Sequence, residues 1–61
     1  MTDIELTREL IATKLRVAAG CLTIAARGIE LNLLETARIE YVMAQRASDE
    51  AAALWEEMNH S

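Results

Sequence analysis

The sequence predicts an all-α protein, an antiparallel hairpin of two helices that dimerises into a four-helix bundle. Three observations favour this fold. The 61 residues include no proline and two glycines, and 52% of them are hydrophobic, mostly Ala, Leu and Ile. Apolar residues recur at steps of three, four and seven, as on one face of a helix. Helix stop and start signals meet near the middle, so we expect a single domain, 1–61, with helices at about 3–27 and 33–58 and a turn at 28–32.

The first helix begins with a capping signal. In the segment TDIE, Thr2 is placed to accept a hydrogen bond from a backbone N–H of the first turn. Glu5 follows three residues later, which is the spacing of a capping box. We therefore expect Thr2 to be the N-cap of the first helix.

The turn is predicted from the segment IAARGIELNLLE, residues 24–35. Gly28 follows an apolar-periodic stretch, so we expect it to end the first helix with a positive φ. Asn32 is expected to cap the second helix, with Glu35 as its capping-box partner. The alternative is one continuous helix that tolerates Gly28 in its interior at a cost of about 1 kcal/mol.

Each predicted helix carries a heptad-like apolar seam. On the first helix the seam comprises Ile4, Ile11, Leu15, Ala18, Leu22, Ala25 and Ile29. On the second helix it comprises Leu34, Ala37, Tyr41, Ala44, Ser48, Ala51, Trp55 and Met58. Further apolar residues lie outside these seams, at Leu10, Val17, Ile24 and Leu31 on the first helix and at Ile39, Val42 and Met43 on the second.

These additional apolar residues predict self-association, because a hairpin offers each helix only one partner. A chain of this length buries little surface alone, and its single cysteine allows no internal disulfide. A dimer is the simplest assembly that covers the remaining surface, and a larger helical oligomer is the alternative. The expected oligomer interface contains Ile11, Leu15, Leu22, Leu34, Ile39, Tyr41, Val42, Met43 and Trp55.

Charge is divided unequally between the two halves. Residues 1–29 carry three acids and four bases, and residues 30–61 carry seven acids and two bases, which together give the net charge of −4. The acids gather late in the second helix, at Asp49, Glu50, Glu56 and Glu57. One interpretation is a solvated face that keeps an alanine-rich helix soluble. The functional hypothesis is a surface that docks a protein with a basic surface, since complementary charge speeds and orients association.

The sequence contains little that favours catalysis. Its single histidine, His60, is one residue from the end, and Cys21 has no base beside it in sequence. No basic and apolar leader precedes the first helix, and the longest charge-free run, 17–26, is half the length of a membrane span. We expect a cytoplasmic, non-enzymatic protein without a cofactor.

Two alternative functions are kept as hypotheses. Glu57 and His60 form a Glu-x-x-His step, which carboxylate-bridged metal sites in helical bundles use. The first helix carries Lys14, Arg16 and Arg27 with no acid between Glu9 and Glu30, a candidate contact for nucleic acid.

In length and layout the chain resembles the plasmid-encoded RNA-binding hairpins of the Rop type, which dimerise into four-helix bundles. This resemblance is architectural, and it transfers no functional residue. Against an RNA contact, three bases per chain are few for a phosphate-dominated interface, and the net charge is negative. We therefore expect a protein-binding adaptor, regulator or inhibitor. One hypothesis, by analogy of size and charge, is a phage or plasmid accessory factor acting on a nucleic-acid-handling protein.

Overall fold

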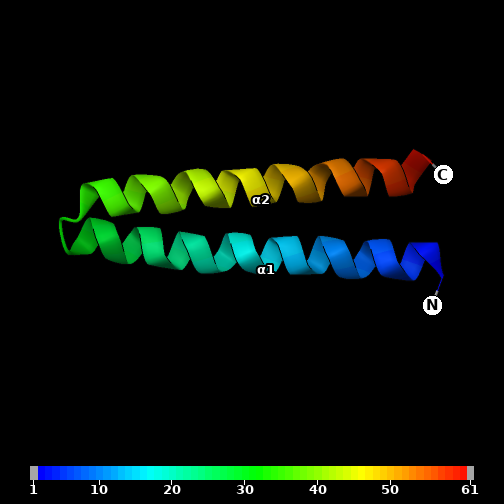
Figure 1. Ribbon diagram of the computed structural model, residues 1–61, viewed down its shortest axis with the longest axis horizontal. Helices are drawn as coiled ribbons and strands as arrows, with labels where there is room; N and C mark the ends of the chain where they lie inside the picture. Colours follow the sequence, from blue (N-terminus) through cyan, green and yellow to red (C-terminus); the bar gives the residue numbers. More distant parts are fainter. Residues whose placement is uncertain (1, 61) are drawn as a thin grey trace.

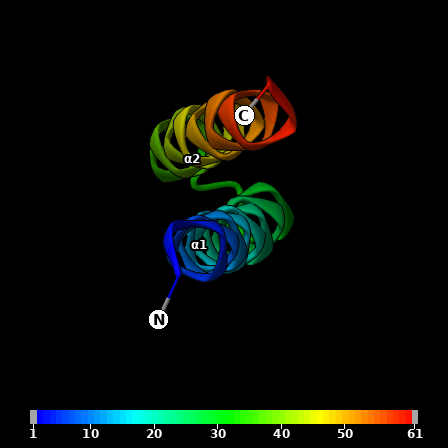
Figure 2. The same cartoon turned by 90° about the vertical axis from the view of Figure 1, so that its right-hand side faces the viewer.

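The computed structural model describes residues 2–60 and shows the predicted antiparallel two-helix hairpin (Figure 1). Helix α1 covers Asp3–Glu30 and helix α2 covers Leu34–His60. The two helices lie side by side along their whole length, and the start of α1 and the end of α2 lie at the end of the hairpin opposite the turn (Figure 1). The Cα trace extends 44 × 18 × 10 Å. Viewed from the end, the helices form one layer with two open broad sides (Figure 2).

Helix α1 begins at the predicted cap. Thr2 has extended backbone angles, and its Oγ1 accepts a hydrogen bond of 3.1 Å from the backbone N–H of Glu5. This bond satisfies one of the N–H groups that a helix start leaves without a partner. The carboxylates of Asp3 and Glu5 lie in the first turn, where the helix dipole favours negative charge.

The chain reverses at Asn32, and the prediction that Gly28 ends the helix with a positive φ is wrong. Asn32 has φ 59°, and no glycine has a positive φ in the described residues. The backbone N–H of Leu33 donates to the carbonyl of Gly28 at 2.7 Å, and that of Asn32 donates to Ile29 at 3.1 Å. This pair of bonds defines a Schellman motif with Asn32 at C′, a position that asparagine tolerates better than most residues.

The second helix starts one residue later than expected, and Asn32 is not its N-cap. Leu33 immediately precedes α2, and its carbonyl accepts the N–H of Ala37 at 3.0 Å. Glu35 lies within 3.8 Å of Arg38 in an exposed ion pair. Helix α1 runs three residues beyond its expected end and α2 two residues beyond its own, so the turn is only residues 31–33.

Small side chains fill the contact between the helices. The buried residues of α1 are Ile11, Ala18, Cys21, Ala25 and Gly28, and those of α2 are Ala37, Ala44, Ala47 and Ala51. They recur at steps of three, four and seven, as in a coiled-coil seam. Gly28 has no β-carbon, and one added there would lie 3.0 Å from Cβ of Ala37. The two backbones therefore approach closely at the turn end.

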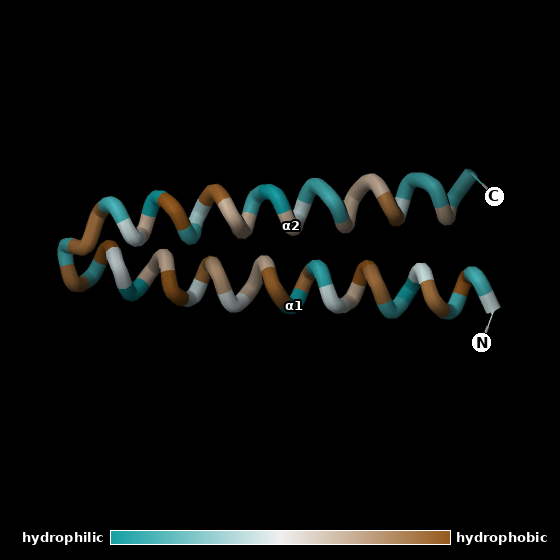
Figure 3. The backbone as a smooth tube through the Cα atoms, in the orientation of Figure 1, coloured by the Kyte–Doolittle hydropathy of each residue, from teal (hydrophilic) through white to brown (hydrophobic). Residues whose placement is uncertain are grey.

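Large apolar side chains are mostly outside this contact, which corrects the predicted seams. Alanines 18, 25, 37, 44 and 51 are buried as expected, but Leu15, Leu22 and Ile29 are exposed, as are Leu34, Tyr41 and Trp55. Close approach of small residues leaves no room between the helices for these side chains. Figure 3 shows hydrophobic segments recurring along the whole of α1. Neither helix in residues 2–60 has a stretch long and apolar enough to cross a membrane.

Candidate functional site

The most extensive candidate surface is an apolar groove on one broad side of the hairpin. Leu15, Leu22 and Ile29 project from α1, and Leu34, Tyr41 and Trp55 project from α2; we call this side the groove face. Three open cavities adjoin along it. Leu22 and Tyr41 line both the first and the second cavity, and Leu15 lines both the second and the third. The groove therefore runs from the turn almost to the open end.

Alanines form the floor of the groove. On α1, the floor contains Ala12, Ala19 and Ala26, each three or four residues from a large side chain of the groove face. On α2, it contains Ala37 and Ala44, which also lie in the helix contact. Rows of small residues beside rows of large ones create holes that accept side chains from another helix. The groove face thus has the shape of a surface that packs against another helix, although no third helix of the hairpin covers it.

Ionic residues are nearly absent from this face. The side chains that line the three cavities include two arginines, Arg8 and Arg38, and no acid. The chain has ten acids and a net charge of −4, so an acid-free lining reflects a strong segregation of charge. Arg38 and Arg8 lie toward opposite ends of the groove, which leaves its centre uncharged.

A second apolar row lies on the other broad side. Leu10, Val17 and Ile24 repeat every seven residues on α1, Leu31 continues this spacing just after the helix ends, and Met43 lies on α2; we call this side the opposite face. Each of these residues is two positions along the chain from a residue of the groove face. Side chains two positions apart on a helix point in directions about 200° apart. Lys14 and Glu50 form an ion pair of 3.4 Å between the helices on this side. The opposite face therefore mixes apolar side chains with charge.

The predicted oligomer interface is divided by the structure into three groups. Leu15, Leu22, Leu34, Tyr41 and Trp55 lie on the groove face, and Ile11 is buried between the two helices of the hairpin. Ile39, Val42 and Met43 are exposed but do not line the groove. Sequence reasoning assigned Ile29 to the seam inside the hairpin and gave Ala12, Ala19 and Ala26 no role. Their seven-residue spacing beside the leucine row was the available signal.

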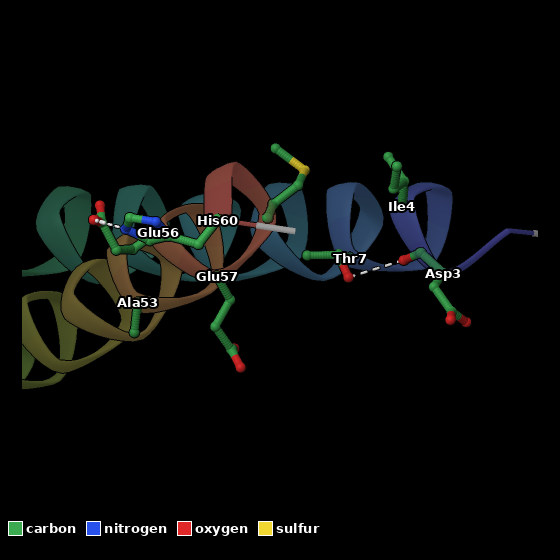
Figure 4. Close-up of a pocket in the computed structure, with 8 residues that line it drawn as sticks. Asp3, Ile4, Thr7, Ala53, Glu56, Glu57 and His60 are labelled. Atoms are coloured by element: carbon green, nitrogen blue, oxygen red, sulfur yellow. Dashed lines mark hydrogen bonds and ion pairs between the residues drawn. The ribbon is translucent and has the colours of Figure 1, made fainter.

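The acidic cluster lies on the last turns of α2. Asp49, Glu50, Glu56 and Glu57 are exposed. Glu50 pairs with Lys14, and the carboxylate of Glu56 lies 2.8 Å from Nε2 of His60. Figure 4 shows Glu57 extending away from the imidazole. The cluster is therefore exposed to solvent, and no member of it lines the groove face.

A fourth open cavity lies between the start of α1 and the end of α2. It is lined by Asp3, Ile4, Thr7, Ala53, Glu56, Glu57, Met58 and His60 (Figure 4). The Thr7 hydroxyl donates to the carbonyl of Asp3 at 2.9 Å. His60 contacts Glu56, four residues earlier, and not Glu57, the partner in the metal hypothesis. No group of three or more potential ligands (His, Cys, Asp or Glu) that could hold a metal gathers within residues 2–60.

The three basic residues of the nucleic-acid hypothesis do not form one surface. Lys14 is half-buried at the helix contact and pairs with Glu50, whereas Arg16 and Arg27 are exposed and three turns apart. A phosphate would compete with a carboxylate for Lys14. Cys21 is buried in the helix contact, where it packs as a small apolar side chain.

Comparison with known proteins gives no family assignment. The chain matches no family model, no curated protein sequence and no solved structure.

Proposed function

We propose that this protein is a small, non-enzymatic protein-binding module that assembles as a homodimer. The exposure of its large apolar residues carries the proposal. Sixteen such side chains in residues 2–60 are exposed, including the single tryptophan and the single tyrosine. Monomeric soluble proteins rarely expose continuous apolar patches of this extent, and such patches mark sites of association. A four-helix bundle of two hairpins is the simplest assembly that covers one broad side of this surface.

The acidic cluster is the surface we assign to a second protein. Asp49, Glu50, Glu56 and Glu57 are exposed and lie away from the groove face, so a dimer formed through that face presents two copies of the cluster to solvent. Negative surfaces of this kind attract proteins with basic surfaces and accelerate their association. Proteins that handle nucleic acid have such surfaces. We propose a cytoplasmic adaptor, regulator or inhibitor of that class of protein, and a phage or plasmid accessory factor fits the size.

The proposal is tested with two matched variants. One carries Asp49→Asn, Glu50→Gln, Glu56→Gln and Glu57→Gln, and the other carries Arg16→Gln with Arg27→Gln. The exposed ion pairs lost from the acidic cluster are worth at most about 1 kcal/mol each. Removal of like-charge repulsion returns a few tenths of a kcal/mol per pair. Both variants should therefore fold, which circular dichroism will check.

Each variant is immobilised and exposed to an extract of the native host, and the captured proteins are quantified by mass spectrometry. We expect the unmodified chain and the arginine variant to capture basic proteins. They should be lost from the acidic variant and at high salt, because exposed charge is screened. Equal capture by the acidic variant contradicts the proposed docking surface. Capture of RNA that only the arginine variant loses favours the nucleic-acid function instead.

A further inference from the structure

We propose that the groove face, and not the opposite face, is the surface that a second copy of this chain covers. This inference rests on the proposed function, since it names the self-association surface of the proposed dimer. Both faces are apolar, so exposure alone does not separate them. Three properties support the groove face: its charge and its shape distinguish it from the opposite face, and its area suffices for a stable dimer.

The first property is charge. Two copies that each carry a net charge of −4 repel one another, and this repulsion is weakest when their acids are far apart. The cavities of the groove face are lined by no acid. The opposite face contains the Lys14–Glu50 ion pair. Contact through the groove face therefore places no carboxylate in its three cavities and leaves the acidic cluster outside them, whereas contact through the opposite face desolvates charge at a cost.

The second property is area. The helices span 44 Å by 18 Å in the plane of the hairpin, so one broad side covers roughly 800 Å², which is what each partner buries in a standard interface. The groove extends over most of this length. Full coverage by an identical broad side therefore reaches the size of a stable dimer.

The third property is the shape and composition of the groove face. The groove face alternates large side chains with the alanine row of α1, which suits packing against helices. It also contains Tyr41 and Trp55, which are 50% and 52% exposed. Aromatic residues are enriched at interface cores. A protein with a basic surface would find no acid in this groove to pair with, and an identical helical surface is the occupant that its chemistry fits.

Trp55 gives a direct test because it is the only tryptophan. We expect its fluorescence in the unmodified protein to be shielded from acrylamide at high concentration. On dilution through the dimer dissociation constant, the emission should shift to longer wavelength and quenching should increase. Emission from a dimer that stays fully quenchable at every concentration overturns the assignment of the groove face.

Matched variants test the same inference by mass. Leu15→Gln with Leu22→Gln alters the groove face, and Val17→Gln with Ile24→Gln is the control on the opposite face. The side chains of the two pairs are similarly exposed, at 44% and 47% against 49% and 50%. Four leucines leave the dimer interface in the first variant, so its dissociation constant should rise at least about a hundredfold. The control should remain dimeric.

The possible results separate the two proposals. Dissociation of the control alone, or a folded unmodified protein that is monomeric at every accessible concentration, overturns the groove assignment. If the groove variant unfolds, the Trp55 dilution series decides. A dimer that uses the groove but captures no basic protein leaves this inference standing and contradicts the proposed docking role of the acidic cluster.

Discussion

Replacing Gly28 by alanine should destabilise the hairpin, whereas the same replacement at Gly20 should stabilise it. Both glycines lie inside α1. Around Gly20 an added β-carbon would meet no atom within 4 Å. At Gly28 it would lie 3.0 Å from Cβ and 3.2 Å from Cα of Ala37, and 3.2 Å from the carbonyl oxygen of Leu33. Two of these three neighbours are backbone atoms, which cannot move without separating the helices.

The magnitude follows from two opposing effects. Alanine improves helix propensity by roughly 0.5–1 kcal/mol over glycine in a helix interior, and this gain is smaller in the last turn, where Gly28 lies. Overpacking a close contact costs about 1–3 kcal/mol. We therefore expect Gly20→Ala to raise the free energy of unfolding by about 0.5–1 kcal/mol and Gly28→Ala to lower it by about 1 kcal/mol.

The assay is urea unfolding followed by circular dichroism, with all variants at one protein concentration because association contributes to apparent stability. Adding Ala37→Gly to Gly28→Ala removes the closest contact and should recover part of the loss in a double-mutant cycle. Equal stabilisation by alanine at both glycines would refute the close approach of the helices at Gly28.

The remaining predictions concern the caps and the ion pair. Thr2→Ala should lower the free energy of unfolding by about 1 kcal/mol, and an unchanged urea midpoint would refute the cap. Asn32→Gly should be neutral or stabilising, whereas Asn32→Val should cost at least about 1 kcal/mol, because Asn32 has φ 59°; equal midpoints would refute the left-handed turn. A double-mutant cycle of Lys14→Met and Glu50→Gln should give a coupling of at most about 1 kcal/mol in low salt and less in high salt, since both side chains are substantially exposed. A larger coupling that salt leaves unchanged would contradict this exposure.

The hairpin itself was predictable from the sequence, but the residue that ends the first helix was predicted wrongly. Glycine is the commonest residue at the left-handed position that ends a helix, which favoured Gly28. The structure uses Asn32 there and keeps Gly28 helical. What selects this arrangement is the contact of Gly28 with Ala37, a neighbour from the other helix. A local capping rule contains no information about that contact.

The candidate surfaces were predicted in part for a similar reason. Apolar periodicity identified the rows of Leu15 and Leu22 and of Tyr41 and Trp55, and placed them both in the helix seams and in the expected oligomer interface. In the structure alanines occupy the helix contact, and these rows line its edge. Hydrophobicity gives greater weight to large residues, yet close helix approach selects small ones. Only the paired geometry of both helices shows which row is inside and which row is left for a partner.

Sedimentation equilibrium of the unmodified protein tests the central claim, that the apolar residues of the groove face are covered by a second copy. A helical species with twice the chain mass of 6.8 kDa, dissociating on dilution, is the result we predict. A fully helical, monodisperse species of one chain mass at every concentration would contradict it.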